Sequence, residues 1–115
     1  MSVRKEKINN LERLEIMEDK CGISLEGLSA HLQFYDEEID APSIVINGEV
    51  HAKNGAEIKT NIQIVATAFD SNGIVLCSDY SNILAERFYV LEYFKITIMN
   101  LIDIPVKIRV YPKIW

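Results

Sequence analysis

The chain is poor in the two residues that most often break regular structure, with five glycines and three prolines among 115 residues. This scarcity excludes a collagen-like repeat and a low-complexity linker. Apolar residues make up 49% of the chain and charged residues 25%, which is an ordinary globular composition. The length predicts one domain with a core of its own.

The chain also lacks an excess of basic charge. It has 12 lysines and arginines against 17 aspartates and glutamates, a formal net charge of −5. The charges of residues 1–20 cancel, so the acidic excess lies in the remaining residues. Clustered lysine and arginine are needed to bind nucleic acid or an anionic membrane surface, so the sequence predicts no nucleic-acid partner and no membrane partner.

Long apolar runs and cysteine clusters are absent as well. No apolar run approaches the roughly 18–20 residues that cross a bilayer, and the charged N-terminal residues do not fit a signal peptide. We therefore expect a soluble, cytoplasmic protein. Two cysteines, Cys21 and Cys77, could form one disulfide by count alone, but in a cytoplasmic protein we expect both to be reduced.

The clearest signal that is present lies between Lys59 and Tyr80, where two β-branched runs flank a turn at residues 70–73. Asp70 can cap this turn through its side chain, and Asn72 and Gly73 tolerate a left-handed backbone. The pattern predicts a β-hairpin, and the buried row of its first strand would be Ile62, Ile64, Ala66 and Ala68.

Alternation of apolar and polar residues predicts further strands at residues 28–35, 43–52, 88–99 and 106–111. Asn54-Gly55 is typical of a second hairpin turn, and residues 81–87 have room for one helical turn. Together these elements predict an all-β fold, an immunoglobulin-like β-sandwich of about six or seven antiparallel strands over residues 21–115.

The first twenty residues follow a different period. Ile8, Leu11, Leu14 and Met17 are spaced three apart among charged residues, which predicts a short amphipathic helix over residues 4–19. A loosely docked arm is the alternative. Because the apolar stripe is narrow, we expect residues 1–20 to be a separate N-terminal helix or arm that adds little to the core.

Part of the chain, about Ile44–Tyr111, resembles FxLYD-type immunoglobulin-like domains of bacterial proteins, a family of unassigned function. In that family a glycine-bearing strand precedes a long strand that ends in an aromatic-Asp pair, followed by a turn and a returning strand. The matching residues here are Gly48-Glu49-Val50, Asn54-Gly55, Asn61–Asp70 and Asn72-Gly73-Ile74-Val75. This chain departs from the name-giving motif of the family, since Ala66 replaces its first aromatic residue, Ala68 its leucine and Phe69 its tyrosine. The resemblance implies a sandwich fold and no catalytic residue.

Reactive side chains form no recognisable pattern. His31 and His51 are expected on polar, solvent-facing strand surfaces without a third zinc ligand. The carboxylates of residues 36–40 alternate in direction and do not converge on calcium by themselves. Cys77 lies in an apolar strand, where burial raises a thiol pKa. Since phosphate-binding glycine loops and Gly-x-Ser-x-Gly are also absent, we expect no enzymatic activity, no cofactor and no metal.

The aromatic stretch Phe88–Phe94 is the one functional lead. Alternation along a strand sends Phe88 and Phe94 inward and leaves three residues, Tyr89, Leu91 and Tyr93, on the outer face. Tyrosine rings with apolar neighbours are typical interface anchors. The sequence therefore predicts a non-enzymatic interaction module that binds a protein partner or a second copy of itself. The alternative is a small-molecule or carbohydrate-binding domain that uses this stretch as a platform.

Overall fold

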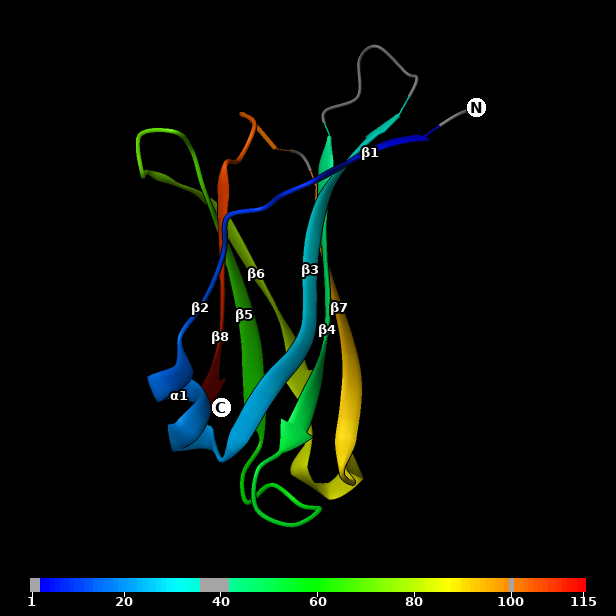
Figure 1. The fold of residues 1–115 in the computed structure, drawn as a ribbon, viewed down its shortest axis with the longest axis vertical. Helices are drawn as coiled ribbons and strands as arrows, with labels where there is room; N and C mark the ends of the chain where they lie inside the picture. Colours follow the sequence, from blue (N-terminus) through cyan, green and yellow to red (C-terminus); the bar gives the residue numbers. More distant parts are fainter. Residues whose placement is uncertain (1–2, 36–41, 100) are drawn as a thin grey trace.

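The computed structural model describes residues 3–35, 42–99 and 101–115. Eight strands in these residues form two four-stranded sheets that pack face to face (Figure 1). Sheet A has the order β1-β3-β4-β7 and sheet B the order β2-β8-β5-β6. The elements are β1 Val3–Lys7, β2 Leu11–Arg13, α1 Glu15–Cys21, β3 Ile23–Tyr35, β4 Ser43–Ala52, β5 Ile62–Phe69, β6 Val75–Ile83, the 3-10 turn η1 Ala85–Arg87, β7 Leu91–Ile98 and β8 Lys107–Ile114. The mostly β fold confirms the expected class.

Alternation along the strands builds the core between the two sheets. The predicted row of β5 is fully buried, and the apolar residues of the facing sheet meet it. These residues are Ile62, Ile64, Ala66 and Ala68 of β5, Ile44, Ile46 and Val50 of β4, and Phe94, Ile96 and Ile98 of β7. Burial of apolar surface on this scale is the main favourable term in folding such a domain.

The central hairpin forms as predicted from β5 and β6, which pair antiparallel on either side of the turn. The Asp70 carboxylate accepts hydrogen bonds from the backbone N–H groups of Asn72, at 2.8 Å, and Ile74, at 2.9 Å. Gly73 takes the left-handed backbone with a φ of 78°. The returning strand β6 runs on to Ile83, three residues past the expected end.

The second predicted hairpin, at Asn54-Gly55, is wrong. Residues 53–61 cross from β4 in sheet A to β5 in sheet B, so these strands do not pair with each other. Strand β4 has no free side for β5, because Ala52 N donates to Val90 O beside β7 and Lys53 N donates to Gly22 O beside β3. Asn54-Gly55 is typical of a turn, but it does not form a hairpin because β4, the strand before it, pairs with β3 on one edge and with β7 on the other.

The predicted helix over residues 4–19 is also wrong in its first part. Residues 3–7 form β1, antiparallel to β3, and residues 11–13 form β2, parallel to β8, so the sandwich has one parallel pair and more strands than expected. The unpaired edges of β3 and β8 offer backbone hydrogen bonds that outweigh the weak helical stripe. Between the two strands, Ile8 is buried and its N–H donates to Ala30 O.

Helix α1 is anchored by a buried carboxylate. Glu18 is 1% exposed and accepts two hydrogen bonds from the Arg13 guanidinium, at 2.9 and 2.5 Å, and one from the Leu25 N–H at 3.0 Å. One side chain thereby joins β2, α1 and β3. The N-terminal residues thus contribute buried groups, contrary to the expectation that they add little to the core.

We predict that Glu18→Ala lowers the free energy of unfolding by about 2–4 kcal/mol, because it leaves the Leu25 N–H and the Arg13 guanidinium without their acceptor. Glu18→Gln, which retains one acceptor oxygen, should lose less. Glu15→Ala on the exposed side of the same helix is the control and should change the value by no more than about 0.5 kcal/mol. Urea unfolding measures all three, and equal losses for the two alanine variants would contradict the role of Glu18.

Gly48 fixes the contact between β4 and β7. It is paired with Phe94, and a Cβ added at Gly48 would lie 2.8 Å from Phe94 Cε2 and Cζ and 2.8 Å from Leu28 Cδ2. Phe94 is buried in this space. An aromatic ring that covers a glycine on the neighbouring strand holds the register of the pair. The register of β7 therefore depends on the missing side chain at Gly48.

We predict that Gly48→Ala destabilises the protein by about 1–3 kcal/mol through overpacking against the Phe94 ring. In the background Phe94→Leu, which removes the crowded ring atoms, the added methyl group should cost less. Chemical denaturation of the two single variants and the double variant measures this coupling. Strict additivity of the two changes would contradict the proposed contact.

Candidate functional site, the outer edge of β7

Four strands lie at sheet edges, and three of them carry features that discourage pairing with another chain. The edge strand β1 presents a run of exposed charges at residues 4–7, and β2 has three residues. The edge strand β6 has a register shift where it meets Phe69 and exposes Asp79. Strand β7 is eight residues long and pairs with β4 without a register shift. Its one exposed charge is Lys95, and it is the longest of the four edge strands without a register shift.

Along β7, the backbone N–H and C=O groups of one residue bond β4 and those of the next residue point away from β4. Residues that face each other in an antiparallel pair alternate between hydrogen-bonded and non-hydrogen-bonded sites. Ala52 N donates to Val90 O, so Val90 is in a hydrogen-bonded site. Every second residue after it, Glu92, Phe94 and Ile96, is therefore also hydrogen-bonded to β4. The polar backbone groups of Tyr93, Lys95 and Thr97 therefore point away from β4, to the edge where no other strand of the described residues pairs with β7.

All three predicted site residues are exposed, and they lie on this edge strand or directly before it. The exposed fraction is 72% for Tyr89, 43% for Leu91 and 59% for Tyr93, while Phe88 and Phe94 are buried as expected. Tyr93 Oη donates a hydrogen bond to Asn47 Oδ1 at 2.5 Å, which ties the ring to β4. We call Tyr89, Val90, Leu91 and Tyr93 the β7 patch.

Val90 is the residue of the patch that sequence reasoning missed. Its φ is +68°, a region that β-branched residues rarely adopt. Leu91 N donates to Tyr89 O at 2.8 Å, so the three residues form a tight turn of the classic γ type, which is strained. The Val90 N–H donates to Ala56 O at 2.6 Å and its carbonyl oxygen accepts from Ala52, which holds the turn in place. Strain of this kind concentrates at functional sites.

We predict that Val90→Gly raises the free energy of unfolding by about 1 kcal/mol, because glycine accepts a positive φ without steric cost. Val106→Gly, at another exposed valine without a positive φ, is the matched control and should lower it by about 0.5–1 kcal/mol. Thermal unfolding measures both variants. A loss of stability in Val90→Gly as large as in the control would contradict the strain at residue 90.

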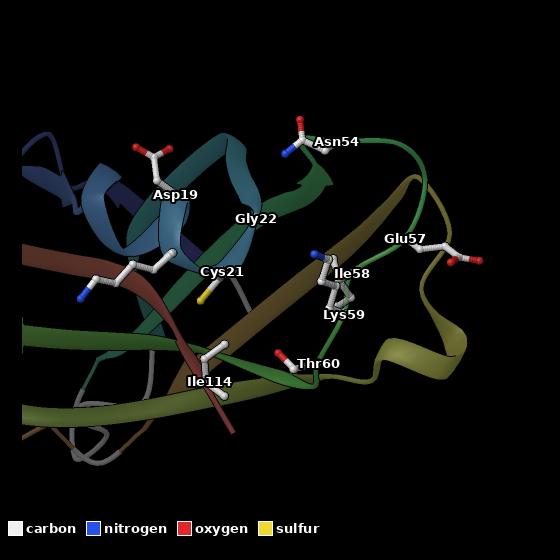
Figure 2. A pocket seen from close by; sticks show the side chains of 10 residues that line it. Asp19, Cys21, Gly22, Asn54, Glu57, Ile58, Lys59, Thr60 and Ile114 are labelled. Carbon is white, nitrogen blue, oxygen red and sulfur yellow. The ribbon is translucent and has the colours of Figure 1, made fainter.

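A cavity lies beside the end of α1 and the connection between β4 and β5. It has a volume of about 360 Å³ and is lined by residues 19–22, Asn54, residues 57–60 and Ile114. None of the residues 88–94 lines it. In Figure 2 the side chains of Asp19 and Glu57 point outward on different sides of the cavity, so its carboxylates do not converge on one point.

Reactive groups elsewhere are few and separate. Cys21 and Cys77 are free, and burial raises the pKa of both thiols, with Asp79 adding to the effect at Cys77. His31 and His51 are half-buried and not exposed as expected, and His51 Nε2 lies 2.9 Å from Glu49 Oε1. Among the described residues no group of three or more His, Cys, Asp or Glu side chains lies close enough to hold a metal ion.

The carboxylates of residues 36–40, which the sequence offered as a candidate calcium loop, lie outside the described part of the chain. Within the described part, no helix has the length and apolar character needed to cross a membrane. Comparison of the chain with protein-family models, curated proteins and solved structures gives no match. Function therefore has to be inferred from the geometry of the molecule itself.

Proposed function

We propose that this protein is a non-enzymatic interaction module that binds a protein partner or a second copy of itself through the β7 patch. The observation that carries the proposal is the combination of a regular edge strand with exposed aromatic and apolar side chains on that strand and in the turn before it. Edges of this kind bind extended chains through backbone hydrogen bonds, and side chains beside the edge supply the specificity.

The strained turn at Val90 supports the same surface. It holds the exposed residues Tyr89 and Leu91 on a backbone fixed by hydrogen bonds to Ala56 and Ala52. A patch that is rigid before binding loses little conformational entropy when a partner docks. Tyrosine adds large contact area with few rotatable bonds.

Binding of a carbohydrate or another small molecule to the aromatic stretch has less support. Such sites are concave and combine an apolar wall with convergent polar groups. The described cavity uses none of the residues 88–94, and Tyr93 is already hydrogen-bonded to Asn47. An enzymatic role has little support as well, because the raised thiol pKa of Cys21 and Cys77 works against nucleophilic chemistry.

We also propose that the sandwich is immunoglobulin-like and related to FxLYD-type domains. Its support is the strand order β3-β4-β7 in one sheet and β8-β5-β6 in the other. If β3 to β8 are read as strands A, B, C, C′, E and F, this is the immunoglobulin order. The short strand β2 then occupies the place of strand G beside β8, in parallel orientation.

We predict that the double variant Tyr89→Ser and Tyr93→Ser weakens association about tenfold or more, equivalent to ~1.4 kcal/mol, because it removes two anchoring rings. The free energy of unfolding should fall by less than about 1 kcal/mol, since both rings are exposed. Self-association is measured by analytical ultracentrifugation, and partner binding by quantitative affinity capture with the chain as bait.

The matched control is Tyr80→Ser, an exposed tyrosine on β6 of the other sheet, which should leave association unchanged. Unfolding of the double variant would show that the two rings are structural. A folded double variant that associates as the original chain does would move the interaction surface away from β7.

A further inference from the structure

We infer that the occupant of the β7 edge is a second copy of this chain, whose β7 strand adds antiparallel to the first. This inference rests on the proposed function and narrows it to self-association. It follows from three properties of β7, namely the direction of its backbone groups, the placement of its charges and the faces of its side chains.

The backbone limits the possible registers. Only Leu91, Tyr93, Lys95 and Thr97 direct polar backbone groups to the outer side, so the hydrogen-bonded pairs across a twofold axis must come from this set. A register that pairs Leu91 with Thr97 of the second copy, and Tyr93 with Lys95 of the second copy, uses the whole set. The Leu91 N–H already donates within the γ-turn, but its carbonyl oxygen is available to the Thr97 N–H.

The charge of Lys95 selects among the registers. Shifting the pairing by two residues in one direction places Lys95 opposite Lys95 of the second copy, and like charges directly opposite destabilise a strand pair. Shifting it in the other direction places Tyr93 opposite Tyr93 and shortens the overlap. In the proposed register Lys95 lies opposite the Tyr93 ring, which favours a cation–π contact, and like charges do not face each other within β7.

The side-chain faces also agree with this pairing. Because paired residues share a face, the exposed row of one copy continues the exposed row of the other, and Phe94 lies opposite Phe94 on the inner side. The two A sheets then become one continuous sheet. An added strand of this length makes a small interface, so we expect a weak dimer with a Kd in the micromolar range or higher, which dissociates on dilution.

The first test changes the edge without changing the fold. Proline at position 95 removes an N–H that points outward and leaves the ladder with β4 intact, a substitution that sheet edges tolerate. We expect Lys95→Pro to abolish dimerisation in sedimentation equilibrium while thermal unfolding stays cooperative. Lys95→Ala retains the N–H but loses the contact with the Tyr93 ring, so it should dimerise more weakly than the original chain and more strongly than Lys95→Pro. A Lys95→Pro variant that dimerises as the original chain does would overturn the inference. Circular dichroism shows whether the variant is folded, so that a loss of dimerisation at the edge is distinguished from unfolding.

The second test reads the register. In a background with Cys21→Ala and Cys77→Ala, one preparation carries Tyr93→Cys and another Lys95→Cys. Residues in a hydrogen-bonded antiparallel pair lie about 5.5 Å apart at Cα, within the range that a disulfide spans. We expect a mixture of the two preparations to form a crosslinked dimer under mild oxidation, with a yield about fivefold higher or more than from either preparation alone. In the mixture the two cysteines occupy paired positions, which have the geometry of a disulfide. In either preparation alone the two cysteines are offset along the strands and do not have this geometry.

The outcomes separate this inference from the proposed function. A crosslinked dimer in the mixture, together with loss of dimerisation in Lys95→Pro, supports both. A chain that stays monomeric up to millimolar concentration overturns the inference. If that monomeric chain still captures another protein in a manner that depends on Tyr89 and Tyr93, the proposed function stands without it. Strong crosslinking of Tyr93→Cys alone would overturn the proposed register.

Discussion

The packing of the Phe94 ring over Gly48 is the contact on which the outer surface of this sandwich depends. It sets the register of β7 against β4, and the register decides which residues face the core and which face outward. A slip of one residue would bury Tyr93 and Lys95 and expose Phe94. The proposed binding surface is therefore a consequence of core packing, because one missing Cβ inside the sheet positions a row of side chains on its edge.

The N-terminal residues shape the opposite side of the molecule. They cross from sheet A, where β1 pairs with β3, to sheet B, where β2 pairs with β8, and this crossing is visible in Figure 1. Glu18 then locks the crossing to β3 through the Leu25 N–H. This segment adds one strand to each sheet, so β1 and β2 form one edge of their sheets and β7 and β6 form the opposite edges. Of β6 and β7, only β7 pairs with its neighbour without a register shift.

Much of the core could be predicted from sequence because alternation is a local signal, and the buried row of β5 and the outward position of Tyr93 follow from it directly. The partner of each strand could not, since pairing depends on edges that distant residues leave free. Asn54-Gly55 has the chemistry of a hairpin turn but follows a strand that is already paired on both sides. The left-handed Val90 carries no sequence signal, because hydrogen bonds from Ala52 and to Ala56 impose it.

Amide hydrogen exchange on β7, followed residue by residue as a function of protein concentration, tests the account most directly. The amides of Phe94 and Ile96 bond β4 and should be protected at every concentration, whereas those of Tyr93, Lys95 and Thr97 point outward. We predict that exchange of these three outward amides slows as the protein is concentrated, while the amides of the residue 70–73 turn keep their rates. Outward amides that exchange at the same rate at every concentration, while another surface gains protection, would contradict the account.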